Sequence, residues 1–300
     1  EAVLKVQKNG TLVEQAPDGE GGWYQSQVYI CAPSGFTIST SNSFADTNQW
    51  RNQISYSDGD FTQNRVGYYL KRDGDNAISQ AKLAPAYKQD TVAPTGSIVA
   101  GSSAWNGYGS GSTFTYSFQN AVLVTFHGSD DLSGVPLEND DNVTETGIRY
   151  LVTDQVLTEA QLKSRPDNQW SRGTEYSFDS PKGIVYAEIK DRAGNRTYIR
   201  SGGLMVDGEA PSLTITAQPP VNAWTDVKTP VIKGTVKDPL SALKDRYVTY
   251  EIGPVVDGNP VYGYPFEIKY AADNTFTIEL PDLDDGKYGV RISAQDNAGN

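Results

Sequence analysis

The 300-residue chain has a single cysteine, a single histidine and a single methionine, and it has no long apolar run. One cysteine excludes an intrachain disulfide and any metal site built from several cysteines. No stretch approaches the roughly 18 apolar residues that a membrane-spanning helix needs, so we expect no membrane insertion. Cys31 lies in the strand-like run QVYICAP, where we expect a small core residue.

Cationic residues are scarce as well. Lys and Arg together number 25 against 37 Asp and Glu, which gives a net charge of −12, and no basic run exceeds two residues. Binding a polyanion requires clusters of Lys and Arg, so we expect no nucleic-acid partner. Hydrophobic residues make up 37% of the chain and aromatic residues 11%, which is enough for small cores and too aromatic for a disordered chain.

What the chain does contain is an internal repeat. The pattern D-x-A-G-N occurs at 191–195 as DRAGN and at 296–300 as DNAGN, with a weaker copy, DGDN, at 73–76. A second pattern, D-x-x-A-P, follows the two earlier copies as DTVAP at 90–94 and DGEAP at 207–211. A period of roughly 90 to 120 residues indicates tandem domains of that size. The domains that we expect are 1–93, 94–209 and 210–300.

Short runs with the period-two alternation of half-buried strands recur through the chain. Examples are AVLVTF, GIRYLV and GIVYAEIK in the middle third and TFTIEL, PFEIKY and KYGVRISA in the last third. Turn signals such as DGNP, AADN and DLDDG separate them, and no long helical pattern intervenes. Antiparallel strands at this spacing predict an all-β fold of β-sandwich domains.

The two repeated patterns have expected places in such a sandwich. D-x-A-G-N predicts the turn between the last two strands, with its Gly and Asn at positive φ, and D-x-x-A-P closes the final strand. One short helix is expected in the middle domain at LTEAQLKS, where Thr158 caps the helix, Gln161 completes a capping box and Arg165-Pro166 ends it.

The chain stops at the third copy of the turn. We therefore expect the last domain to be C-terminally truncated, lacking its final strand and leaving an exposed sheet edge. The chain begins and ends in mid-pattern and shows no signal peptide, which suggests an excerpt from a longer mature protein.

The order D-x-A-G-N, then a strand, then V-D-x-x-A-P resembles the bacterial immunoglobulin-like (Big-type) tandem repeats of large Firmicutes cell-surface proteins. The middle domain carries the resemblance through IRYLVTDQVLTEAQLKS, GIVYAEIKDRAGNRTYI and LMVDGEAP. The first domain resembles a sister repeat through WYQSQVYICAPSGFTIS, and the third resembles a variant through TPVIKGTVKDPLSALK. The resemblance implies three tandem immunoglobulin-like β-sandwich domains acting as a stalk, spacer or adhesive region.

No set of residues suggests acid–base or nucleophilic catalysis, so we expect no catalytic residues and no enzyme. His127 lies at a strand end in AVLVTFHGSDD, and its sequence neighbours there do not point at one another as a triad requires. Cys31 has no supporting histidine nearby. Paired carboxylates lie in polar turns rather than across a cleft, so we interpret them as surface charge. They are Asp130 with Asp131, Asp140 with Asp141, and Asp284 with Asp285.

We expect no metal site and no cofactor, with calcium as the alternative. Hard oxygen ligands in loops and at domain junctions can bind Ca²⁺ and stiffen a tandem array. The candidates are Asp90 at the first junction, Asp207 and Glu209 at the second, and the loop ENDDN around Asp140. None of them has EF-hand spacing, and acidic surface loops usually bind nothing.

The ligand-binding candidates are Trp105 and Tyr108, in the segment GSSAWNGYGSGSTFTYSF. Exposed planar aromatics among small polar residues can stack on sugar rings. The alternative, which packing favours, is that Phe114, Tyr116 and Phe118 face the core and that Trp105 fills a junction.

Our leading hypothesis is a non-catalytic structural or adhesive region of a bacterial cell-surface or secreted multidomain protein. Such a region is extracellular, cell-wall associated and monomeric, and its partners are a host glycan or a surface protein. The alternative is a carbohydrate-binding accessory region of a secreted glycan-active enzyme, which loss of glycan binding in Trp105→Ala would favour. Fold resemblance alone does not decide between them.

Overall fold

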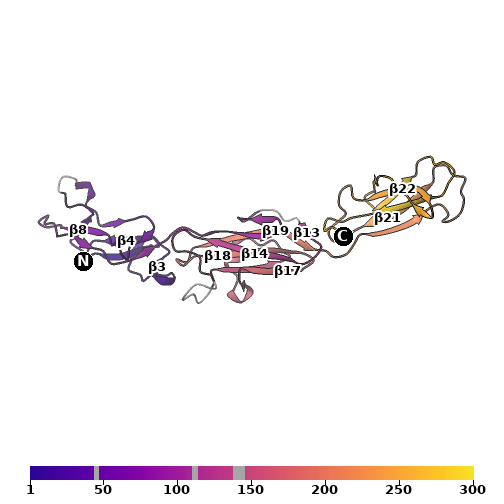
Figure 1. Cartoon of the computed structure of the whole chain (residues 1–300). Coiled ribbons are helices and arrows are strands. Elements are labelled where there is room, and N and C mark those ends of the chain that lie inside the picture. The colour runs from indigo at the N-terminus through magenta and orange to yellow at the C-terminus, as the bar shows by residue number, and fades with distance from the viewer. Residues whose placement is uncertain (44–46, 110–113, 138–145) are drawn as a thin grey trace.

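The computed structural model describes residues 1–43, 47–109, 114–137 and 146–300. It consists of β-sheets joined by turns and loops, arranged in three modules that follow one another end to end (Figure 1). The expected all-β fold is confirmed. No helix in the described part of the chain has the length and apolarity needed to cross a bilayer.

The first module packs three sheets, with the strand orders β2–β1–β4–β6, β5–β8–β9 and β3–β10–β7. Alternation along β4 directs Val28 and Ile30 into the core, where neither is exposed. Two 3-10 turns, η1 (Glu20–Gly22) and η2 (Thr47–Gln49), join the sheets. The strands are β1 (Val3–Lys8), β2 (Thr11–Val13), β3 (Trp23–Tyr24), β4 (Val28–Cys31), β5 (Phe36–Ser39), β6 (Gln53–Ser55), β7 (Gly59–Asp60), β8 (Gly67–Arg72), β9 (Lys82–Leu83) and β10 (Lys88–Gln89).

The middle module is a sandwich of two sheets, ordered β12–β11–β14–β17 and β13–β19–β18–β15–β16. Ile98 and Phe126 from the first sheet meet Ile189 and Ile199 from the second in one core. The strands are β11 (Thr95–Ala100), β12 (Ser103–Trp105), β13 (Phe114–Phe118), β14 (Val122–Ser129), β15 (Ile148–Thr153), β16 (Ser171–Arg172), β17 (Glu175–Phe178), β18 (Gly183–Lys190) and β19 (Arg196–Val206).

The expected helix of the middle module is present as α1 (Glu159–Lys163). Thr158 and Gln161 form the reciprocal capping box, and Leu162 is fully buried beneath it. A 3-10 turn, η3 (Asp167–Gln169), follows Pro166.

The third module has the sheet β20–β21–β25 and a second sheet in which β22 pairs with β23, β24 and β26. The expected strand PFEIKY is only partly formed, because β24 is short and both Phe266 and Tyr270 are exposed. The strands are β20 (Ser212–Ala217), β21 (Val231–Lys237), β22 (Thr249–Val256), β23 (Asn259–Pro260), β24 (Phe266–Glu267), β25 (Thr275–Glu279) and β26 (Tyr288–Ser293).

The last sheet has an open edge at β26. In the middle module β18 lies between β15 and β19, whereas β26, which occupies the corresponding place, pairs within the described residues with β22 alone. The C-terminal end of the chain returns to the start of its module, beside the middle module (Figure 1).

Buried hydrophobic side chains form clusters, and each cluster among the described residues stays within one of the ranges 1–93, 94–209 and 210–300. The domain boundaries stay a prediction, but no hydrophobic core spans two modules in the part of the chain that is described. Contact between modules therefore depends on the polar junctions.

Strand β14 offers a direct test of the sandwich core, because its side chains alternate between the core and solvent. Phe126 is 2% exposed and Leu123 is 53% exposed. We expect Phe126→Ala to lower the free energy of unfolding of the middle module by about 3–5 kcal/mol, since it leaves a cavity. Leu123→Ala, the matched control, is expected to cost well under about 1 kcal/mol. Denaturant unfolding measures both, and equal losses would contradict the strand orientation.

Candidate metal centres at the two module junctions

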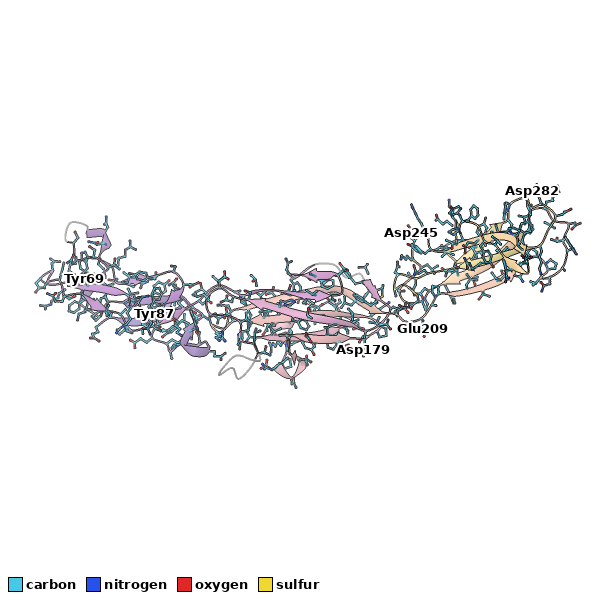
Figure 2. The ribbon with its side chains drawn as sticks, viewed as in Figure 1. Tyr69, Tyr87, Asp179, Glu209, Asp245 and Asp282 are labelled. Carbon is cyan, nitrogen blue, oxygen red and sulfur yellow. The ribbon has the colours of Figure 1, made fainter. Side chains whose placement is uncertain are left out.

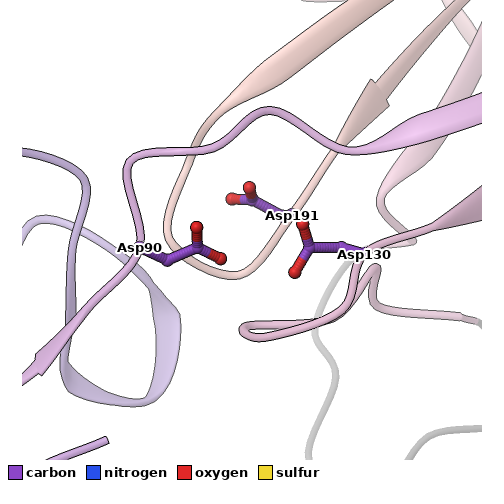
Figure 3. A group of neighbouring side chains, drawn as sticks. All are labelled: Asp90, Asp130 and Asp191. Atoms are coloured by element: carbon purple, nitrogen blue, oxygen red, sulfur yellow. The ribbon is translucent and has the colours of Figure 1, made fainter. Parts of the chain in front are cut away.

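Two groups of three aspartates lie at the junctions between modules. Asp90, Asp130 and Asp191 form the first group, and one carboxylate oxygen from each lies within 4.8 Å of the others. Figure 3 shows these three side chains converging from separate segments of the chain.

The second group, Asp207, Asp238 and Asp296, meets the same 4.8 Å criterion with the same pattern of burial. In each group two carboxylates are almost fully buried and the third is partly exposed. The described residues therefore contain the same arrangement twice, once at each junction.

Corresponding elements supply the members of each group. The first aspartate comes from the linker, with Asp90 after β10 and Asp207 after β19. The other two come from the following module, where Asp130 directly follows β14 and Asp238 directly follows β21. Each group thus joins the end of one module to two loops of the next.

The third aspartate begins the repeated D-x-A-G-N turn. Asp191 Oδ1 accepts hydrogen bonds from the backbone N–H of Gly194 (2.7 Å) and Asn195 (2.8 Å). Asp296 does the same with Gly299 (2.7 Å) and Asn300 (2.9 Å). The glycines take positive φ, 103° and 101°, as the sequence predicted, because a β-carbon is unfavourable there.

The asparagine of the turn has a different role from the one expected. Neither Asn195 nor Asn300 has positive φ. Instead, Asn195 Nδ2 donates to Asp191 Oδ2 and to the backbone oxygen of Asp90, both at 2.9 Å. Asn300 Nδ2 donates in the same way to Asp296 (2.9 Å) and to the backbone oxygen of Asp207 (2.7 Å). The motif therefore ties each turn to the preceding linker.

Each linker aspartate accepts a hydrogen bond from a backbone N–H of the following module. Asp90 Oδ2 accepts from the N–H of Ser133 at 3.1 Å, and Asp207 Oδ2 accepts from the N–H of Ser241 at 3.0 Å. These serines belong to the loops D-x-L-S-G at 130–134 and D-x-L-S-A at 238–242, which begin with the middle aspartate of each group. The Oδ1 atoms of Asp130 and Asp238 accept hydrogen bonds from backbone N–H groups of their own loops.

The buried charge in each group lacks a cationic partner. Within the described residues, no Lys or Arg forms an ion pair with any of the six aspartates. Burial raises the pKa of the Asp191 carboxyl above its ordinary value, and the charge of Asp90 raises it further, against the lowering effect of the hydrogen bonds from Asn195 and Gly194. Concentrated negative charge of this kind is costly unless a cation is near.

One oxygen in the second group has no hydrogen-bond partner among the residues that the structure describes. Asp238 Oδ2 has less than 1 Å² of exposed surface and no hydrogen bond. Because a buried unsatisfied charged oxygen is unfavourable, this atom fits a site that binds a cation. The donor set of carboxylate oxygens suits a hard divalent ion, and Ca²⁺ in particular. Asp207, Asp238 and Asp296 would hold it at this junction, and Asp90, Asp130 and Asp191 at the other.

The first junction has further contacts between modules. Glu20 N–H donates to the backbone oxygen of Arg192 at 2.6 Å, and Gln25 Nε2 donates to that of Gly194 at 3.0 Å. Gly19 lies against Arg192 and Ala193, so closely that a β-carbon there would overlap the backbone. The first two modules are therefore joined by a broader polar contact than the linker alone.

Only some of the calcium candidates lie in the two aspartate groups. Asp90 and Asp207 lie in the two groups, whereas the side chain of Glu209 is exposed beside the second junction (Figure 2). The loop around Asp140 lies outside the described residues. Asp130, which we interpret from the sequence as surface charge, is partly exposed and faces Asp90 and Asp191. Asp131, Asp284 and Asp285 are exposed.

Asp130, Asp191, Asp238 and Asp296 were not predicted as ligands. The recurrence of D-x-L-S at 130–133 and 238–241 was the signal that could have identified the middle aspartates. For the third aspartates, the D-x-A-G-N pattern was recognised as a turn, but its partners lie in other segments of the chain.

The aromatic candidates pack within the middle module. Trp105 is half-buried, and its ring meets the edge of Tyr116 with 4.9 Å between centroids. Tyr108 donates its hydroxyl hydrogen to the backbone oxygen of Leu157 and lies near Tyr186. His127 is exposed on β14, and Cys31 is a buried free cysteine of the first module.

Another buried acid, Glu188, has cationic partners around it. It is 2% exposed and accepts hydrogen bonds from Arg149 (2.8 Å), Arg196 (2.7 Å) and Tyr198 (2.6 Å). Burial alone would raise the pKa of Glu188, but the hydrogen bonds from Arg149 and Tyr198 and the charge of Arg196 hold it below its ordinary value. Glu188 is therefore compensated by the protein itself, and the junction aspartates are not.

No known protein family matches the chain, and no curated protein matches it. Among solved structures it is similar to dimeric latent PorU from Porphyromonas gingivalis, with a TM-score of 0.25 and 11% identity over 98% of this chain and 33% of that one. It is also similar to SGBP-B of the mixed-linkage glucan utilization locus of Bacteroides ovatus, in complex with a mixed-linkage heptasaccharide. There the TM-score is 0.19 and the identity 12%, over 68% of this chain and 65% of that one. The chain thus spans less than two thirds of either protein, and likenesses this weak carry no argument about function.

The raised pKa of Asp191 predicts a pH dependence in metal-free protein. The folded state binds the proton of the Asp191 carboxyl more tightly than the unfolded chain does. Protonation of Asp191 therefore stabilises the fold at a pH below its ordinary pKa of 3.8, and this stabilisation is lost as the pH rises through the higher folded pKa. We expect the difference in unfolding free energy, wild type minus Asp191→Asn, to fall across that range.

Thermal unfolding in chelator at a series of pH values measures this difference. The matched control is Asp179→Asn, which removes an exposed carboxylate of the same module that lies outside the group (Figure 2). A difference for Asp191 that rises with pH would contradict the burial of an uncompensated charge.

Proposed function

We propose that the chain is a non-catalytic, rod-like region of an extracellular bacterial surface protein, with its modules held end to end by a divalent cation at each junction. The observation that carries this proposal is the repetition of one three-aspartate arrangement at both junctions. Each arrangement takes one ligand candidate from the linker and two from the following module. A cation bound there restricts the angle between neighbours, which is the property that a stalk or spacer needs.

Calcium is the cation that the chemistry favours. It takes oxygen ligands in flexible geometry, and modules of extracellular proteins bind it with dissociation constants of about 10⁻⁴–10⁻³ M. Binding to the folded state alone stabilises that state, by about 2.7 kcal/mol when the free ion is at 100 times its dissociation constant. The cation would also offset the cost of burying the Asp191 carboxylate, which is the main cause of its raised pKa, and the smaller effect of the charge of Asp90.

The resemblance to Big-type repeats supports an extracellular, cell-wall-associated location, and so does the acidic composition, with its net charge of −12. The partners of a monomeric stalk with an adhesive role are a host glycan or a surface protein. The alternative, a carbohydrate-binding accessory region, needs an accessible surface other than Trp105, because that ring packs on Tyr116.

Calcium should raise the unfolding temperature of the wild-type chain relative to chelator, and Asp90→Asn and Asp207→Asn should each remove part of that rise. Each variant removes one carboxylate charge from one group. The asparagine keeps a side-chain oxygen that can accept the same hydrogen bond from a backbone N–H. Calorimetry measures the transitions, and isothermal titration should give about two sites for wild type and one for each variant.

Asp179→Asn and Asp282→Asn, which change exposed aspartates, are the matched controls and should respond to calcium as wild type does (Figure 2). No rise in unfolding temperature and no binding heat in wild type would overturn the cation sites. Small-angle scattering tests the rod separately: a compact particle in calcium and in chelator would overturn the stalk, whichever way the metal result falls.

A further inference from the structure

The first module carries a polar groove that none of the junction chemistry uses. Its volume is about 690 Å³, which is within the range of small-ligand sites. Strands β4, β5 and β6 and the turn η2 contribute to it. Its lining is Tyr29, Ser39, Thr40, Gln49, Arg51, Asn52, Gln53, Ile54, Ser55 and Tyr56.

Strand alternation explains how the groove acquires its polar wall. Val28 and Ile30 of β4 point into the core, so Tyr29 lies on the opposite face of the sheet. On the neighbouring strand β6, Ser55 pairs with Tyr29 and Gln53 pairs with Cys31, which places their side chains on that same face. The floor of the groove is therefore a rigid sheet, and its rim is the segment 49–52.

The side chains in the groove have hydrogen-bonding capacity that the protein leaves unused. Within the described part of the chain, the guanidinium of Arg51 and the amides of Asn52 and Gln53 form no hydrogen bond or ion pair. The phenol groups of Tyr29 and Tyr56 are likewise without a hydrogen bond there. By contrast, the buried amide of Gln89 in the same module is satisfied, with hydrogen bonds to Gln27, Val28 and Asp58.

The chemistry of this lining selects the ligand class. Amides, hydroxyls and a guanidinium match the many hydroxyl groups of a sugar, and tyrosine rings can lie against its apolar face. Among the described residues of the lining Arg51 alone is charged, so a polyanion finds too little positive charge. The scarcity of apolar side chains also disfavours a hydrophobic ligand.

We propose that this groove binds a short oligosaccharide, neutral or with a single negative charge. Tyr29 provides the stacking surface, Gln53 and Asn52 hydrogen-bond the sugar hydroxyls, and Arg51 favours a ligand that carries one carboxylate. The site goes beyond the stalk function and is independent of both aspartate groups.

The test measures binding of cellohexaose, xylohexaose, mannohexaose and 3′-sialyllactose to the full chain by saturation-transfer NMR and titration calorimetry. We expect at least one of these glycans to bind, and Tyr29→Ala to weaken that binding about tenfold or more, as loss of a central aromatic contact does. Gln53→Ala should weaken it as well while leaving the unfolding temperature unchanged. If the ligand is sialyllactose, Arg51→Ala should weaken it most.

The matched control is Phe36→Ala, which removes another half-buried aromatic ring of the first module, on β5, where it packs against the core and does not line the groove. This variant and Asp90→Asn should bind the glycan as wild type does. The proposal is overturned if no glycan of the set binds, or if Tyr29→Ala and Gln53→Ala bind as tightly as wild type. Equal loss in Phe36→Ala would also overturn it, since the effect would then reflect the stability of the module.

Discussion

The structure depends on how it accommodates three carboxylates brought together at each module junction. Their attraction for backbone amides positions the loops, with Asp90 and Asp207 each accepting from the serine of a D-x-L-S loop in the next module. Burial and mutual repulsion oppose the same arrangement: burial raises the pKa of Asp191, and the charge of Asp90 raises it further. The proposed cation would resolve the conflict, because it would let the loops keep their hydrogen bonds while it removed the repulsion.

The middle module shows that the fold can bury an acid in another way. Glu188 has Arg149, Arg196 and Tyr198 around it, so it contributes a self-contained polar network to one sheet. Residues of that network all belong to one module, whereas each aspartate group draws on two. The difference is consistent with a role for the aspartates in joining modules rather than in holding a single module together.

Division of the chain into modules also separates two kinds of surface. The ends of the modules are committed to junction contacts, such as those of Asn195 and Asn300 with the preceding linkers. The faces of the sheets are free to carry binding sites, and the groove beside Tyr29 occupies such a face. If the junctions are fixed as proposed, the ligand site of the first module lies at a defined distance from the third module.

Local rules in the sequence determined the all-β fold, the capped helix after Thr158 and the turn around Gly194, because alternation, capping and positive φ depend on neighbouring residues. The partial formation of PFEIKY shows the limit, since its pairing depends on β22, which lies earlier in the chain. Only the tertiary structure decided that Asp130 faces Asp90 and Asp191, since these residues come from three segments that the local pattern cannot relate. The same holds for the groove, whose wall arises from the pairing of Tyr29 with Ser55 across two strands.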